Sequence, residues 1–212
     1  MRLLPPAFAA AVLLDLASLL AGWDTGHLVA KPLLMPLLAA YAVARRGPRT
    51  LVAALLFGWG GDVLLMAGAD PAFLAGMAAF AAGHCCWLTL FGRGRTSPVL
   101  GAGYALVLAG ALVLLWPDLP AGLRLPVAVY SVLLTAMAYR SSAAGAVAGL
   151  GGALFLLSDM LIAVGLADRP RLPAADFWIM LTYAVAQYLL TVGALGRACA
   201  RGRAYGEPRT DV

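Results

Sequence analysis

The chain has 212 residues, of which 63% are hydrophobic and 12% are charged, and its mean hydropathy is +0.89. Soluble domains are roughly half apolar and a quarter charged, so this composition excludes a soluble globular protein. The formal net charge of +5 comes from basic residues scattered along the chain, not gathered beside base-reading elements. We therefore expect an all-α membrane protein with no nucleic-acid partner.

Eight apolar stretches come close to the roughly 20 residues that a helix needs to cross the hydrocarbon core of a bilayer. They predict transmembrane helices at roughly 4–22, 28–44, 50–68, 72–92, 98–116, 124–140, 143–166 and 175–196. Because the connections are short, we expect a single eight-helix bundle over residues 1–197 and a C-terminal tail over 198–212. Pro5, Pro6 and Asp15 interrupt the first stretch, which favours a retained helix over a cleaved signal peptide.

The distribution of basic residues predicts the orientation of these helices. With a cytoplasmic N-terminus, 11 of the 15 Lys and Arg residues fall in cytoplasmic segments. Positive charge concentrates on the cytoplasmic side of membrane proteins, and an even number of spans returns the C-terminus to the side of the N-terminus. We therefore expect both termini in the cytoplasm and a multi-pass protein of the cell (inner) membrane.

The two halves of the chain share a weak sequence pattern. LFGWGGDVLLMAGADP at 56–71 is similar to LFLLSDMLIAVGLADRP at 154–170, since each has an LF pair, an Asp, and a second Asp near a Pro. In the stretch that follows, His84 aligns with Gln187 at an offset of 103 residues. We expect two four-helix halves with the same orientation, related by an axis along the membrane normal.

Two aspartates lie inside these apolar stretches, Asp62 in GWGGDVLLM and Asp159 in LFLLSDMLIA. A carboxylate at membrane depth is costly unless it is protonated, paired or hydrated, and intramembrane acids usually mark a functional site. The single lysine of the chain, Lys31, cannot neutralise both aspartates, so at least one would be protonated or hydrated. We therefore expect both aspartates to be functional and to face a common cavity.

Four other polar side chains are predicted near the same depth: Lys31, His84, Tyr183 and Gln187. We expect them to bind substrate or to support the aspartates. Each also has a purely structural explanation, because a lysine can extend to the interface and the other three can hydrogen-bond between helices. With two histidines and no CxxC spacing, the sequence predicts no metal site and no cofactor.

Five short motifs follow one another along the chain: KPLLMPLL (31–38), FGWGGDVLLM (57–66), FAAGHCCW (80–87), LFLLSDMLIA (154–163) and YAVAQYLL (183–190). In this order they resemble the YhhN family, whose animal members are the TMEM86 lysoplasmalogenases. The resemblance implies an integral-membrane hydrolase that acts on a lysolipid with water. It would cleave the vinyl ether bond of lysoplasmalogen to a fatty aldehyde and glycerophosphoethanolamine or glycerophosphocholine. It also implies that the characteristic intramembrane acids of the family are Asp62 and Asp159.

A pair of acids suits the chemistry that this resemblance implies. A vinyl ether opens when the carbon distal to the oxygen is protonated, and water then captures the oxocarbenium ion. One protonated and one ionised carboxyl group serve such a reaction, as they do in glycoside hydrolysis. Lys31 beside one aspartate would keep that aspartate ionised. The sequence does not decide which aspartate is the acid.

Three other functions stay open from the residues alone. A proton-coupled transporter would also place acids near the midplane of two repeated halves. An intramembrane aspartyl protease would need YD and GxGD motifs, which neither aspartate matches. A non-catalytic lipid-binding protein would need the aspartates for stability alone. The headgroup preference and the oligomeric state are undetermined by the sequence.

Overall fold

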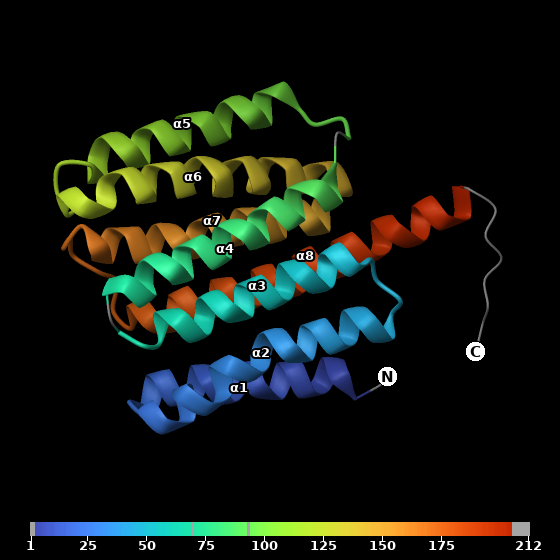
Figure 1. The fold of residues 1–212 in the computed structure, drawn as a ribbon, viewed down its shortest axis with the longest axis horizontal. Helices are drawn as coiled ribbons and strands as arrows, with labels where there is room; N and C mark the ends of the chain where they lie inside the picture. The colour runs from blue at the N-terminus through green and yellow to red at the C-terminus, as the bar shows by residue number, and fades with distance from the viewer. Residues whose placement is uncertain (1–2, 69, 93, 205–212) are drawn as a thin grey trace.

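The computed structural model describes residues 3–68, 70–92 and 94–204, a part of the chain that contains eight α-helices and no strand (Figure 1). The helices are α1 (Leu4–Ala21), α2 (Asp24–Ala44), α3 (Arg49–Leu65), α4 (Asp70–Phe91), α5 (Pro98–Leu115), α6 (Ala121–Ser141), α7 (Ala146–Leu166) and α8 (Ala175–Ala204), with a short 3-10 helix, η1 (Ser142–Ala144), before α7. Consecutive helices run in opposite directions, so α1 begins and α8 ends at the same end of the bundle (Figure 1). We call this the terminus end and the opposite one the far end.

The expected all-α architecture is confirmed, and each predicted stretch coincides approximately with one α-helix, although α2 begins four residues before the predicted start at 28. Within the described residues, seven helices are long and apolar enough to cross a membrane, so the chain is a multi-pass membrane protein. The exception is α3, whose 17 residues span about 26 Å at 1.5 Å per residue, against a hydrocarbon core of about 30 Å. Residues 205–212 of the expected tail lie outside the described part of the chain.

The last helix continues past its apolar stretch. We expected the span to end near residue 196, whereas α8 runs to Ala204. The added segment is rich in Ala and Arg, which are good helix formers, so the helix propagates after the hydrophobic sequence ends. The start of the expected tail is therefore helical.

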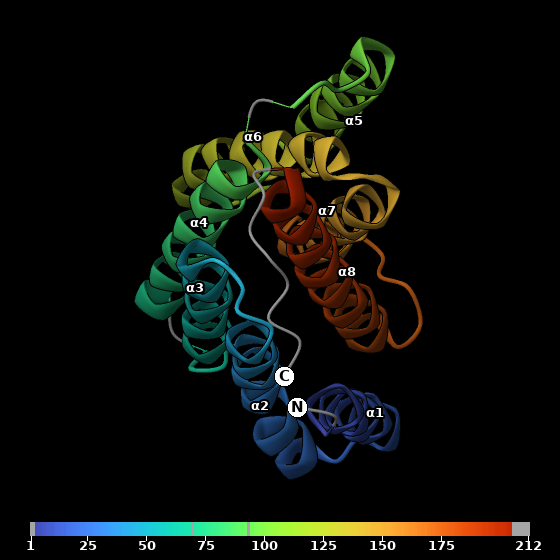
Figure 2. The same cartoon turned by 90° about the vertical axis from the view of Figure 1, so that its right-hand side faces the viewer.

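Seven of the helices form a closed ring. In the order α1, α2, α3, α4, α6, α7 and α8, each helix contacts the next, and α8 returns to α1. Figure 2 shows the ring end-on, with α5 outside it next to α6. Of the α5 residues only Leu115 is buried, and the main apolar core contains no residue of this helix. The ring therefore supplies the core, and α5 is peripheral.

Two prolines lie inside α2 without interrupting it. Pro36 has no N–H, so the carbonyl of Pro32, four residues earlier, has no donor within the helix. The indole Nε1 of Trp59 on α3 donates a hydrogen bond of 3.0 Å to this carbonyl. Pro36 thus leaves the Pro32 carbonyl free to accept from Trp59. This hydrogen bond ties α2 to α3 next to Lys31.

Glycines bring the aspartate-bearing helices close to their partners. A Cβ atom at Gly61 on α3 would lie 2.5 Å from the ring of Phe80 on α4. A Cβ atom at Gly151 on α7 would lie 2.8 Å from the backbone nitrogen of Leu190 on α8. Real Cβ contacts are longer than this, so only glycine permits these two approaches. They hold α3 against α4 and α7 against α8, which positions Asp62 and Asp159 inside the ring.

Candidate active site

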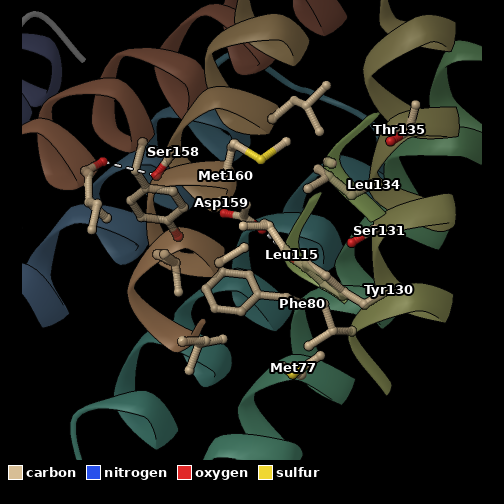
Figure 3. Close-up of a pocket in the computed structure, with 18 of the residues that line it drawn as sticks. Met77, Phe80, Leu115, Tyr130, Ser131, Leu134, Thr135, Ser158, Asp159 and Met160 are labelled. Carbon is tan, nitrogen blue, oxygen red and sulfur yellow. Dashed lines mark hydrogen bonds between the residues drawn. The ribbon is translucent and has the colours of Figure 1, made fainter. Parts of the chain in front are cut away.

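Asp62 on α3 and Asp159 on α7 line the same cavity. The cavity has a volume of about 110 Å³ and is lined mainly by apolar side chains from α3 to α8. Asp62 is 3% exposed, whereas Asp159 is partly exposed. Figure 3 shows Asp159 near Tyr130, Phe80 and Met160, with its carboxyl group toward the space between them. The structure thus brings both predicted acids to one mainly apolar cavity.

Asp62 is held by two side chains of α8. The Tyr183 hydroxyl donates a hydrogen bond of 2.7 Å to Oδ2 of Asp62. One turn later, Nε2 of Gln187 donates to the Tyr183 oxygen over 3.3 Å. All three side chains are buried. Gly58, one turn before Asp62, makes room for Tyr183 and Gln187, since a Cβ atom there would lie 3.3 Å from Gln187 Nε2.

Asp159 is held by side chains of α6 and α4. The Tyr130 hydroxyl donates a hydrogen bond to Oδ2 of Asp159, and Nε2 of His84 lies 3.1 Å from the same hydroxyl. Because the Tyr130 proton points to Asp159, the proton between Tyr130 and His84 belongs to Nε2. An imidazolium would leave a second N–H buried without a partner in the described part of the chain, so the neutral Nε2–H tautomer of His84 fits this arrangement. Its Nδ1 is buried and has no hydrogen-bond partner among the described residues.

The two networks have the same form. Each runs from an aspartate to a tyrosine and then to a third polar side chain, Gln187 in one network and His84 in the other. Both tyrosines line the cavity, whereas Gln187 and His84 lie behind them. These two predicted site residues therefore reach the aspartates through a tyrosine and do not contact the cavity.

Lys31 lines the cavity from α2. Its ammonium group interacts electrostatically with Asp62 and also with Asp15 on α1. Asp15 is 1% exposed, and its Oδ1 lies 2.8 Å from Nδ1 of His27. Lys31 thus provides positive charge near two buried acids, of which Asp62 lines the cavity and Asp15 does not.

Sequence reasoning missed Tyr130 and the pairing of Asp15 with His27. Tyr130 lies in the apolar segment VAVYSVLL (127–134), and an isolated tyrosine in such a segment usually packs at a helix interface. Tyr130 could have been recognised from its predicted depth, because its hydroxyl, on the helix that precedes that of Asp159, lies level with this aspartate. Asp15 stood out as an interruption of the first apolar stretch, without a recognisable partner.

The arrangement is suited to acid and base chemistry. Two carboxyl groups share an apolar cavity, but one lies near an ammonium group and the other connects to a neutral imidazole. Different surroundings give two acids different charges at one pH, which is how paired carboxyl groups divide acid and base roles. Among the residues that the structure describes, no three His, Cys, Asp or Glu side chains are grouped so as to hold a metal ion.

The matches to known proteins point to one family. The model of the YhhN family matches residues 26–194. The chain is 41% identical over 124 residues to Lysoplasmalogenase TMEM86B of Homo sapiens, which covers 58% of this chain and 54% of the human one. It is 40% identical over 146 residues to the Sus scrofa protein of the same name, covering 67% and 62%. It is 34% identical over 195 residues to Lysoplasmalogenase of Mycobacterium tuberculosis, covering 80% and 72%.

The extent of these matches differs among the relatives. The chain spans less than two thirds of the length of the human and pig proteins, and about three quarters of the mycobacterial one. The family match begins in α2, so Asp15 on α1 lies before the matched range. No solved structure matches the chain.

Proposed function

Because the chain belongs to the YhhN family, we propose that it is a membrane hydrolase that cleaves the vinyl ether bond of lysoplasmalogen. Its products are a fatty aldehyde and glycerophosphoethanolamine or glycerophosphocholine. The observation that carries this proposal is the pair of aspartates in one apolar cavity, each hydrogen-bonded to a tyrosine. The human, pig and mycobacterial relatives are all named lysoplasmalogenase, which supports the proposed substrate class.

The surroundings of the two aspartates support different roles. Asp62 receives a hydrogen bond from Tyr183 and the positive charge of Lys31, and both favour its ionised form. Asp159 connects through Tyr130 to a neutral histidine. When Asp159 is protonated and donates to Tyr130, the Tyr130 hydroxyl donates to Nε2 of His84, whose neutral imidazole then carries its hydrogen on Nδ1. We therefore assign Asp159 as the general acid and Asp62 as the base.

The reaction then follows from these roles. Asp159 transfers its proton to the alkenyl carbon distal to the ether oxygen, which leaves an oxocarbenium ion at the carbon that bears the oxygen. Asp62 stabilises this cation and takes a proton from the water that attacks the same carbon. The hemiacetal then collapses: its hydroxyl proton passes to the ionised Asp159, and Asp62 gives its proton to the glycerol oxygen as the carbon–oxygen bond breaks. The aldehyde and the alcohol are released with both acids in their starting states. The sum is addition of one water and cleavage of one carbon–oxygen bond.

The placement of the chain in the membrane is part of the proposal. All eight helices span the membrane of the cell (the inner membrane), α3 as a short span, and both termini are cytoplasmic. The distribution of arginines and the common end of α1 and α8 in Figure 1 support this orientation. Residues 1–197 form one bundle of two four-helix halves, followed by a cytoplasmic tail. The paired form of the two aspartate networks supports the repeat.

Orientation is testable with the exposed thiol of Cys199. In a variant that lacks the other two cysteines, Cys85→Ala/Cys86→Ala, a membrane-impermeant maleimide should label Cys199 in inside-out vesicles and not in intact cells. Labelling in intact cells would place the end of α8 outside and reverse the orientation.

Activity is tested on the purified protein by aldehyde release from lysoplasmalogen. Asp62→Asn and Asp159→Asn should each lower turnover by about 100-fold or more, the usual contribution of general acid or base catalysis. Asp176→Asn, on an exposed position at the start of α8, is the matched control and should retain activity. Retained turnover in both cavity variants would remove the acid–base mechanism. A proton-coupled transporter would instead move unaltered lipid across sealed vesicles and produce no aldehyde.

A further inference from the structure

A groove between α5 and α7 is not used by the reaction as described above. Its walls are Leu100, Gly103, Tyr104 and Val107 on α5 and residues of the segment 153–160 on α7. We call it the α5–α7 groove. It has a volume of about 400 Å³, and every lining side chain except Tyr104 is apolar. The groove therefore offers a surface for hydrocarbon beside the candidate active site.

The α5–α7 groove adjoins the cavity of the two aspartates. Val107, Leu156 and Met160 line both spaces. The outer edge of the groove is open, because Leu100, Val107 and Leu157 are 41%, 49% and 47% exposed. Apolar side chains thus extend without interruption from the side of the bundle, where the hydrocarbon of a bilayer would lie, to the cavity that contains the acids.

Contacts at both ends hold α5 in place, and the first half of the helix faces the groove. At the far end, Arg169 Nε donates a hydrogen bond of 2.8 Å to Asp118 Oδ2, which joins the segments after α7 and α5. At the terminus end, Thr96 Oγ1, just before α5, donates to the Tyr139 hydroxyl on α6 over 2.6 Å. The groove between these contacts is therefore a built feature of the fold and not a loose edge.

Resting on the proposed function, we propose that the α5–α7 groove binds the hydrocarbon chain of the lysolipid and is the side entrance by which that chain leaves the bilayer. The part of α5 from Leu100 to Leu115, which lines the groove and then the cavity, is about 22 Å long at 1.5 Å per residue. Half of a hydrocarbon core of about 30 Å is about 15 Å, so this path is long enough for the chain of a leaflet lipid. The vinyl ether bond, at the headgroup end of the chain, then lies beside the acids.

Gly103 provides the sharpest test of this binding site. It lines the groove, and a Cβ atom there would meet nothing within 4 Å, so the backbone leaves room for a side chain to begin at this position. Gly103→Trp should therefore block the hydrocarbon path and leave the fold intact. Ala109→Trp is the matched control, because Ala109 is exposed on the same helix and lines neither space.

The assay compares two substrates that share the vinyl ether bond and the headgroup but differ in chain length, hexadecenyl and butenyl. Apolar pockets discriminate single methylene groups by about 10-fold or more, so Gly103→Trp should lower kcat/KM for the hexadecenyl substrate by at least that factor. The butenyl substrate, which is too short to need the groove, should keep its parental kcat/KM in the same variant. Ala109→Trp should leave both values unchanged.

The outcomes separate this inference from the proposed function. If the parental protein releases no aldehyde from either substrate, the proposed function fails. If the parental protein hydrolyses both, and Gly103→Trp lowers both equally or neither, the groove is not the chain site. Photo-crosslinking with a lysolipid that carries a diazirine on its chain needs no turnover. It should label peptides containing 100–107 and 153–160, and labelling spread evenly over the lipid-facing helices would overturn the inference.

Discussion

The Tyr183 hydroxyl on α8 donates a 2.7 Å hydrogen bond to Asp62 on α3, 121 residues earlier in the chain. Both side chains are buried, so this bond joins the two halves of the bundle inside the cavity. Asp159 of the second half reaches back in the same manner through Tyr130 to His84 on α4. Each aspartate is therefore positioned by a chain of bonds that ends in the other half, and each tyrosine is a positioning residue.

Replacing Tyr183 with Phe should lower turnover while the protein stays folded. A hydrogen bond to a charged buried group is worth about 1.5–3 kcal/mol, which corresponds to a loss of about 10- to 100-fold if the bond is needed in the transition state. The measurement is kcat/KM for aldehyde release. Tyr188→Phe is the control on the same helix, since Tyr188 stacks on Phe8 and does not line the cavity. Equal activity in both variants would show that Tyr183 does not position Asp62.

Tyr130 and His84 should act as one unit. Tyr130→Phe and His84→Ala each interrupt the chain of bonds to Asp159, so the double variant should lose little more activity than either single variant. Side chains in one hydrogen-bond network show coupling energies of about 0.5–3 kcal/mol in such cycles. The test measures kcat/KM and thermal unfolding for the parental protein, the two single variants and the double variant. Losses that multiply in the double variant would mean that the two residues contribute independently.

Much of the architecture was predictable because each apolar stretch is long enough to require a helix, and the two aspartates stand out against hydrocarbon. The ring was not predictable, since it depends on which helix faces pack together. α5 shows why: its sequence is more apolar than those of α4 and α6, yet only Leu115 is buried. An apolar face of a membrane helix can contact either lipid or protein, so the sequence alone does not distinguish the two.

The site was partly predictable for a related reason. Charged residues at membrane depth are conspicuous, so Asp62, Asp159 and Lys31 could be selected as cavity residues. Tyr130 was not selected, because an uncharged hydroxyl in an apolar helix has no distinctive energetic signature in the sequence. His84 was selected, but its connection to Asp159 passes through that missed tyrosine.

Removing the charge of Lys31 should weaken catalysis. Lys31→Met keeps most of the side-chain shape but leaves the ionised form of Asp62 without the nearby positive charge. Because a carboxylate in an apolar site depends on such a charge, turnover should fall by about 10-fold or more. Lys31→Arg keeps the charge and should retain more activity than Lys31→Met. If the two variants are equally active, the charge of Lys31 does not act on the base.

Gly58 should be required for the position of Tyr183. A Cβ atom at Gly58 would lie 3.3 Å from Gln187 Nε2 and 3.6 Å from the Tyr183 oxygen, so a larger side chain must push the pair away from Asp62. Gly60, two residues later, has nothing within 4 Å of the same point. Gly58→Leu should therefore reduce turnover about as much as Tyr183→Phe, whereas Gly60→Leu should retain it. Either substitution removes a helix-interior glycine, which by itself favours the helix by up to about 1 kcal/mol, so a loss confined to Gly58→Leu reports the contact and not helix propensity. Parental kcat/KM in folded Gly58→Leu would show that the reaction does not need the Tyr183–Gln187 pair where the structure has it.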